Sequence, residues 1–492
     1  MKILLIFPPL FNLYHLDITT VMPPLGIATI ATVLEKAGYE VKILDINFLY
    51  RRGFSWGQLE KIIKEIKPNI IGITCTTPAV INVLKIVDIV KSMNPKIFLV
   101  VGGPHASAMP QNLLTIGKTI DVVVIGEGEN TFLELVKFIQ NEKELEKIQG
   151  IAYRRNGNII QTARRPRIEN LDEIPFPARH FFPSLNKYHF AGHCYNRLPV
   201  TSMITSRGCP HNCNFCTQVV FGQKYRTRNA ENVVAEMGEL IKKYRMKSIM
   251  IIDDTFTVDR QRVYEICDLI RRKELKASWL CYAGVQEVDK NMLITMRKAG
   301  CYQIYYGIES GSQRVLNMMN KAVTIEQIKT AVNDAKEAGL EVRGQFMFGY
   351  PTETLQEIKR TIDFAKELNL DYAEFGVTTP LPGSELYNWA ASEGKFRLQI
   401  KSDFNIFQEG TGIFLNPLVA LGEADKKELA KYIKKAYRNF YLRFNYIFNR
   451  FLKIRSLTDI KKNLQAFFTV AFGFIEFYRN EKKYTPIESS RR

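Results

Sequence analysis

The sequence predicts an α/β protein with three parts: an N-terminal doubly wound, Rossmann-like domain, a partial (β/α)6 barrel of the TIM type, and a C-terminal helical segment. Short β-branched runs alternate with amphipathic helical patterns over the first 140 residues, which is typical of βαβ units and a parallel sheet. The alternation resumes after residue 199 with longer helices. The 492 residues exceed one ordinary core, because domains usually contain roughly 100 to 200 residues.

The first domain is expected over residues 1–145. Its strands are KILLIF, VKILD, IIGITC, IFLVVGG and VVVIGEG, and helical patterns such as IATIATVLEKAG separate them. The opening MKILLIF is therefore interpreted as a strand and not as a signal peptide. In a doubly wound sheet, ligands bind beyond the carboxyl ends of the strands. The expected ligand loops are Pro8 to Gly26, Thr74 to Pro78, Gly102 to Ser107 and Gly126 to Asn130.

A linker is expected over residues 146–198, and the barrel over residues 199–390. In the linker, Asn156-Gly157 predicts a small hairpin, and the Pro-rich stretch LDEIPFPAR follows it. The barrel strands are expected at VTSMIT, SIMIID, ASWLCY, CYQIYYGI, VRGQFMFG and YAEFGVT. Six βα modules are too few to close an eight-module barrel, so a partial barrel is predicted, with its chemistry at the carboxyl ends of the strands.

Three of the eight cysteines lie together directly after the first barrel strand. The stretch SRGCPHNCNFC gives Cys209, Cys213 and Cys216 a CxxxCxxC spacing. Structural zinc needs four ligands, and only His211 is nearby, at a poor spacing. A disulfide with a spare thiol is disfavoured, because the other cysteines are scattered singly, as in proteins of a reducing compartment. Iron-sulfur clusters are held by cysteine thiolates, and a cluster with one open iron would explain three ligands.

This motif, placed after the first strand of a six-module barrel, resembles that of the radical S-adenosylmethionine (SAM) superfamily. The resemblance covers about residues 199 to 380. It implies a 4Fe-4S cluster whose open iron chelates SAM, and reductive cleavage of SAM to a 5′-deoxyadenosyl radical that removes hydrogen from an unactivated carbon. The catalytic cluster ligands would be Cys209, Cys213 and Cys216, and the SAM contacts Phe215, Asp253, Asp254, Glu309, Ser310, Arg343 and Gly349.

The resemblance also implies a role for each SAM contact. Asp253 and Asp254 end the second strand and would accept from the SAM amino group. Glu309 ends the fourth strand and would bind the ribose hydroxyls, whereas Gly349 shapes a turn that approaches adenine. Arg343 would meet the SAM carboxylate. Each position also has an ordinary structural interpretation, since paired aspartates, for example, often cap helices.

The first domain is similar to the cobalamin-binding class of that superfamily, in the segments PPLGIATIATVLEKAGYEVKILD and VVGGPHAS. The similarity implies cobalamin contacts at Thr74, Gly102, Gly103 and Gly126, where a larger side chain would hold the ligand off. The DxHxxG motif of histidine-ligated cobalamin is missing after the first strand, so His15 is not expected to bind cobalt. No G-x-G-x-x-G follows that strand, which argues against NAD or FAD, and the acidic Glu127 to Glu129 suits a phosphate poorly.

The C-terminal region, residues 391–492, is expected to be helical, basic and aromatic. Residues 425 to 492 contain 17 Lys and Arg against 6 Asp and Glu, so a net +11 of the chain's +18 lies there. Its longest apolar stretch is shorter than the roughly 20 residues of a membrane span. Two interpretations stay open: an interfacial helix on anionic lipid, or aromatics packed on the barrel beside solvated lysines. Nucleic-acid binding ranks third, and no specific nucleic acid is expected.

The layout most resembles the subgroup that contains anaerobic magnesium-protoporphyrin monomethyl ester cyclase and the hopanoid methylases. The resemblance implies methyl transfer from methylcobalamin to a hydrophobic, lipid or tetrapyrrole-like substrate, with oxidative cyclisation as the alternative reaction. It also implies an electron donor such as flavodoxin or ferredoxin. The scattered single cysteines indicate a cytoplasmic protein, and the basic, aromatic tail leaves peripheral membrane contact open. A non-catalytic cobalamin carrier or sensor would leave the cysteine motif without a purpose. A methylthiotransferase for transfer RNA would need an N-terminal cysteine trio, and the first domain has only Cys75.

Overall fold

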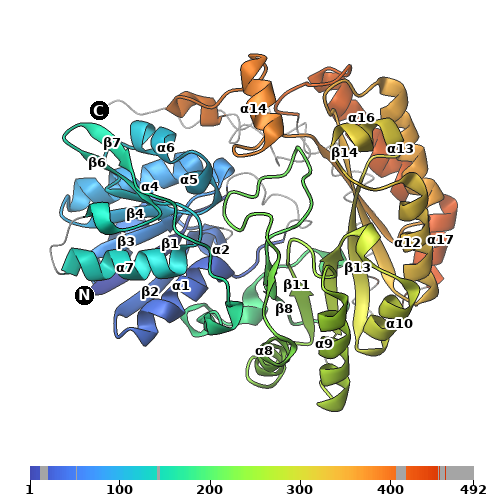
Figure 1. The fold of residues 1–492 in the computed structure, drawn as a ribbon, viewed down its shortest axis with the longest axis horizontal. Coiled ribbons are helices and arrows are strands. Elements are labelled where there is room, and N and C mark those ends of the chain that lie inside the picture. Colours follow the sequence, from blue (N-terminus) through green and yellow to red (C-terminus); the bar gives the residue numbers. More distant parts are fainter. Residues whose placement is uncertain are drawn as a thin grey trace.

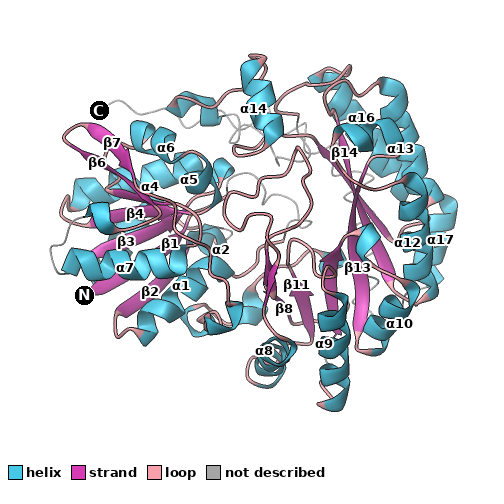
Figure 2. Ribbon diagram, viewed as in Figure 1, coloured by secondary structure: helices cyan, strands magenta, loops and turns pink. Residues whose placement is uncertain are grey.

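The computed structural model describes residues 1–10, 20–50, 52–140, 145–276, 278–405 and 417–452, together with Ile454 and Ile460. His15 and the tail after Ile460 lie outside the described residues. Two sheets with their covering helices stand next to each other, and the chain passes from one to the other through a series of short turns (Figure 1). Strands of the two sheets form separate groups with helices around them (Figure 2). The predicted fold class is confirmed.

The first sheet is doubly wound. Its strands follow the order β2-β1-β3-β4-β5-β6-β7, and the first five are parallel. Alternate side chains of β1 face opposite layers: Ile3 and Leu5 pack with α1 and α7, whereas Leu4 and Ile6 pack with α3 and α4. The elements are β1 Lys2–Phe7, α1 Leu25–Lys36, β2 Glu40–Asp45, α3 Trp56–Ile66, β3 Ile70–Thr74, α4 Val80–Met93, β4 Phe98–Gly102, α5 Pro104–Ala108, α6 Pro110–Ile116, β5 Val122–Val124 and α7 Gly128–Gln140.

The predicted hairpin forms and joins the first sheet. β6 Ile151–Arg155 pairs antiparallel with β5, and β7 Asn158–Gln161 pairs with β6. Both turn residues have positive φ, 49° at Asn156 and 81° at Gly157, which is why Asn-Gly suits this two-residue turn. Four 3-10 turns then lead to the second sheet, and the last of them, Gly192–Cys194, precedes its first strand. The division at residues 145, 198 and 390 remains our proposal.

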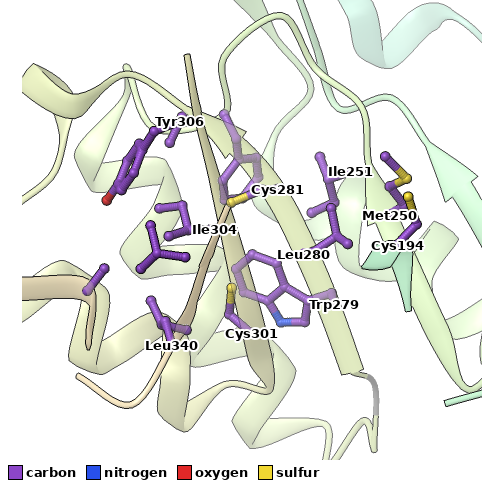
Figure 3. Packing of buried hydrophobic residues seen from close by; sticks show 14 of the residues in the cluster. Cys194, Met250, Ile251, Trp279, Leu280, Cys281, Cys301, Ile304, Tyr306 and Leu340 are labelled. Atoms are coloured by element: carbon purple, nitrogen blue, oxygen red, sulfur yellow. The ribbon is translucent and has the colours of Figure 1, made fainter. Parts of the chain in front are cut away.

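The second sheet is a half-barrel of six parallel strands in sequential order. Among the described residues β8 and β15 do not pair with each other, so the barrel stays open. Trp279, Cys281 and Cys301 lie fully buried in its core (Figure 3). The elements are β8 Val200–Met203, α8 Ala230–Lys242, β11 Ser248–Ile251, α9 Arg260–Arg272, β12 Ser278–Ala283, α10 Lys290–Lys298, β13 Cys301–Glu309, α11 Gln313–Met318, α12 Ile325–Glu337, β14 Glu341–Phe348, α13 Leu355–Glu367 and β15 Tyr372–Val377.

The C-terminal region begins with α14 Glu385–Ser392 and continues, after residues outside the description, with α16 Lys426–Tyr441 and α17 Phe444–Leu452. Helix α16 covers the outer face of β15 and also its free edge. The Phe375 N–H donates to Tyr437 Oη (3.3 Å), and Tyr441 Oη donates to the Ala373 carbonyl (2.9 Å). Tyrosine hydroxyls therefore satisfy backbone groups that an edge strand would otherwise leave open. The packing interpretation of the aromatics is confirmed for α16.

Helix α17, in contrast to α16, leaves its large apolar side chains exposed. Phe444 is 79% exposed and Phe451 69% exposed, and Ile447, Phe448 and Leu452 are exposed on the same helix. The spacing of these residues places them on one face of the helix. None of the described helices is both long enough and apolar enough to cross a membrane.

Candidate functional site

The carboxyl ends of strands in the first sheet and the segments that follow β8 and β11 of the second sheet meet at one cavity of about 510 Å³. All four predicted cobalamin contacts lie in its wall, although they come from three different loops of the first domain. The barrel contributes part of its cysteine loop and the end of β11 to the same wall. The predicted residues that share this cavity are Thr74, Gly102, Gly103, Gly126, Cys209, Cys216 and Asp254.

The glycines of this wall are there for different physical reasons. Gly103 has φ +100°, and a Cβ there would lie 2.8 Å from Thr74 Oγ1, so the fold itself requires glycine. Gly102 has ordinary backbone geometry, and a Cβ would meet nothing closer than Val124 Cβ at 3.6 Å. Glycine at 102 is therefore not needed for folding, and its effect is to keep the cavity open. The cavity wall at Gly102 and Gly103 therefore leaves room for a bulky ligand.

The cysteine loop is held by hydrogen bonds from its neighbours. Asn214 N donates to the Met319 carbonyl (3.0 Å), and Gln218 Nε2 donates to the Cys209 carbonyl (2.9 Å). His211 Nε2 lies 2.6 Å from Glu287 Oε1. This histidine therefore anchors the loop to the short turn Val285–Glu287 that follows β12, which argues against the zinc alternative.

The three thiols influence one another electrostatically. Burial of the thiol and, to a smaller extent, the neighbouring Cys213 and Cys209 together raise the pKa of Cys216 to about 12. Burial likewise raises the pKa of Cys209 to about 11. Within the described chain, no three metal-ligating side chains are already gathered around one point, so the thiols must turn inward to share a centre. Three cysteine ligands in one anchored loop are the donor set that an iron-sulfur cluster takes.

The adjacent Asp253 and Asp254 have different environments. Asp253 is buried and accepts hydrogen bonds from Thr205 N (2.6 Å) and Ser206 Oγ (2.7 Å), so it ties the end of β8 to the end of β11. Asp254 is exposed and lines the cavity. Burial raises the pKa of Asp253, and at Asp254 the partial loss of water around the carboxyl group inside the cavity, followed by the Asp253 charge, raises the pKa as well. Asp254 stays a candidate for the SAM amino group, whereas Asp253 orders the loop.

Glu309 ends β13 with φ 67° and is 5% exposed. Its Oε1 accepts from Lys321 Nζ at 3.1 Å, while its Oε2 is a buried acceptor without a partner among the described residues. Such an orphaned carboxylate oxygen fits a ligand that donates hydroxyl groups. Lys321, which the sequence reasoning missed, also lies close enough to lower the pKa of Cys213, although burial raises that pKa more.

Arg343 differs from the sequence-based expectation. It lies on β14, five residues before the strand ends, which is roughly 16 Å below the edge at 3.3 Å per residue. Its guanidinium pairs with Glu374 and lies 3.5 Å from Cys194 Sγ. Because these partners hold it inside the half-barrel, the structure does not bring Arg343 to the predicted SAM carboxylate. Lys321, and not Arg343, is the cation that lies beside Glu309 and Cys213.

Three further predicted contacts have local packing roles. Ser310 Oγ lies 3.2 Å from Thr361 Oγ1 on α13, so this hydroxyl links the end of β13 to that helix. Phe215 is half-buried and packs against a hydrophobic cluster that includes Tyr350. Gly349 has φ +80°, and a Cβ there would lie 2.9 Å from Leu429 of α16, so the turn requires glycine.

Comparison with known proteins adds independent information. The chain matches the family model of the B12 binding domain over residues 13–136 and that of the radical SAM superfamily over residues 203–365. It is 36% identical over 444 residues to an uncharacterized methyltransferase of Pyrococcus horikoshii, covering 90% of this chain and 93% of that protein. It is 29% identical over 457 residues to the anaerobic magnesium-protoporphyrin IX monomethyl ester cyclase of Rubrivivax gelatinosus, covering 90% and 78%.

A solved structure agrees with the fold. The cobalamin-dependent SAM radical enzyme OxsB, with aqua-cobalamin and SAM bound, superimposes with a TM-score of 0.70 over 97% of this chain and 71% of that one. The two sequences are 18% identical, so this similarity concerns the architecture.

Proposed function

This chain belongs to the cobalamin-dependent radical SAM methyltransferase family, and from that premise we propose that it methylates an unactivated carbon of a small molecule. The observation that carries the proposal is the single cavity into which the glycine loops of the first domain and the cysteine loop of the barrel both open. Methyl transfer needs both cofactors within reach of one carbon, and a shared cavity meets that requirement.

The proposed roles of the residues follow from their positions. Cys209, Cys213 and Cys216 would hold the cluster, and Thr74, Gly102, Gly103 and Gly126 would receive cobalamin. Asp254, Glu309 and Lys321 surround the cysteine loop with the charges that the amino, hydroxyl and carboxylate groups of SAM need. When bound, the 4Fe-4S cluster supplies the electron that cleaves SAM, and cobalamin supplies the methyl group. The electron must come from outside the chain, and we propose a flavodoxin or ferredoxin as its donor.

Oxidative ring formation is the second candidate reaction, because the chain shares 29% identity with a cyclase over 90% of its length. We propose a hydrophobic substrate, either a lipid or a tetrapyrrole-like molecule. The tetrapyrrole named for that cyclase relative supports this substrate class by analogy of sequence.

The two reactions can be separated without knowing the substrate. Anaerobically reconstituted protein is supplied with reduced cobalamin and SAM that carries an isotopic label in its methyl group. We expect labelled methylcobalamin, and 5′-deoxyadenosine once a one-electron reductant is added. Formation of 5′-deoxyadenosine without labelled methylcobalamin would favour ring formation, and formation of neither product would contradict a radical SAM enzyme. A metabolite that accumulates in cells lacking the gene then identifies the substrate.

We further propose a cytoplasmic enzyme that touches the membrane through α17. The exposed apolar face of this helix follows α16, which exposes basic residues, and this combination suits an anionic lipid surface. These residues are Lys426, Lys427, Lys431, Lys435 and Arg438. Replacing Phe448 and Phe451 together with serine should weaken co-sedimentation with anionic phospholipid vesicles severalfold, since two large apolar side chains no longer enter the interface. Asn445→Ser with Asn449→Ser on the same helix is the matched control. Equal sedimentation of both double variants would contradict membrane contact.

A further inference from the structure

We propose that Arg207 is a positioning residue, held by Glu127 and Glu129, that fixes the cobalamin site relative to the cluster site. This inference rests on the proposed function, because it assumes that both cofactors bind in the shared cavity. It assigns a purpose to the acidic Glu127 to Glu129 segment, which the sequence showed to be unsuited to a phosphate.

The ion pairs cross from one domain to the other. Arg207 Nη1 donates to Glu127 Oε1 (2.7 Å), and Arg207 Nη2 donates to Glu129 Oε1 (2.5 Å). The three side chains are 11%, 4% and 7% exposed. Arg226 Nη1 binds the other oxygen of Glu127, Oε2, at 3.0 Å. Two carboxylates therefore bind the guanidinium of Arg207, and one of them, that of Glu127, also binds Arg226.

Both ends of this contact adjoin a cofactor loop. Glu127 directly follows Gly126, a predicted cobalamin contact, and Arg207 stands two residues before Cys209. Arg207 belongs to β9, Ser206–Arg207, which pairs antiparallel with β10, Arg226–Thr227. Arg207 and both glutamates themselves line the cavity. A shift of this contact would therefore move the two cofactor loops relative to each other.

The chemistry of the Arg207 ion pairs indicates that they fix the geometry of the contact and add little to the stability of the fold. A buried ion pair is weak evidence for stability, because desolvation offsets much of its attraction. A guanidinium fork, however, has five N–H groups in one plane and accepts carboxylates only in fixed directions. Lysine would keep the charge and lose this directionality. The barrier to a reaction between two bound groups depends on placing their reacting atoms to within about 1 Å. The Arg207 guanidinium would therefore change the rate of methyl transfer without changing the binding of either cofactor.

The test compares Arg207→Lys and Glu129→Gln with a matched control, Arg228→Lys. Arg228 also lines the cavity and pairs with a buried carboxylate, Glu236 of α8, but both of these residues lie in the barrel, so their ion pair does not cross between the domains. Each protein is loaded with cluster and cobalamin, and iron and cobalamin are quantified. Pulsed electron paramagnetic resonance then measures how strongly the reduced cluster shortens the relaxation time of cob(II)alamin, an effect that falls steeply with distance.

We expect all four proteins to load both cofactors. Wild type and Arg228→Lys should show one strong relaxation enhancement, and Arg207→Lys and Glu129→Gln should show a weaker and more widely distributed one. An unchanged enhancement in both Arg207→Lys and Glu129→Gln, or an equal loss in Arg228→Lys, would overturn the positioning role while leaving the proposed function intact. Wild-type protein that fails to bind cobalamin or iron would overturn the proposed function itself, and the positioning role with it.

Discussion

Cys213→Ala should abolish 5′-deoxyadenosine formation. Two thiolates cannot hold a cluster that needs three protein ligands and one open iron, so we expect the loss to exceed the roughly 10- to 100-fold effect of removing an outer partner of a metal ligand. The measurements are iron and sulfide content after anaerobic reconstitution, and 5′-deoxyadenosine formed from SAM under reducing conditions.

Asn212→Ala is the control for Cys213→Ala, because Asn212 is an exposed neighbour in the same loop. It should keep the iron content and SAM cleavage of the wild type. Cys267→Ser supplies a second control, since Cys267 is a fully buried core residue of the barrel and stands outside the cysteine loop. Substantial 5′-deoxyadenosine from Cys213→Ala would refute the assignment of this thiol as a cluster ligand.

Gly102→Leu should weaken cobalamin binding and leave SAM cleavage intact. The backbone at Gly102 accepts a side chain without strain, and a Cβ would be in ordinary contact, 3.6 Å from Val124 Cβ. Leucine would then project into the cavity. Overpacking typically costs about 1–3 kcal/mol, which corresponds to a roughly 5- to 150-fold loss of affinity. Cobalamin titration followed by visible absorbance measures the affinity, and 5′-deoxyadenosine formation measures the intact cluster site.

Gly57→Leu is the matched control for Gly102→Leu. Gly57 is an exposed residue of α3, and a Cβ there would meet nothing within 4 Å. Gly103→Leu would be a poor choice, because its positive φ and close neighbours would strain the fold. Equal cobalamin affinity of Gly102→Leu and the wild type would show that cobalamin binds elsewhere.

Much of this architecture was predictable because its strands and helices carry strong periodicity. The six barrel strands appear in the sequence as separate apolar runs, and the parallel order follows from the helices between them. The cysteine motif was predictable for another reason: its three ligands lie within eight residues, so no long-range contact is needed to bring them together.

The site residues on the strands were harder to predict, because alternation decides which side chains face the cavity. This rule could have separated Asp253 from Asp254, since neighbours at a strand end point to opposite faces. It could not have identified Lys321, which lies 12 residues after Glu309 and reaches it only through the path of α11 and the following loop. Nor could the sequence show that Glu374 and Cys194 hold Arg343 deep inside the half-barrel.

The tyrosines that α16 places along β15 divide the C-terminal region into a part that the barrel needs and a part that it can lose. A chain that ends before Lys426 would expose the edge of β15, and an exposed strand edge pairs with strands of other chains to form extended sheets. Aggregation of such a fragment would say nothing about lipids. A chain that ends just after Leu452 keeps the strand edge covered, so comparisons of tail length can separate the folding of the enzyme from its attachment to a surface.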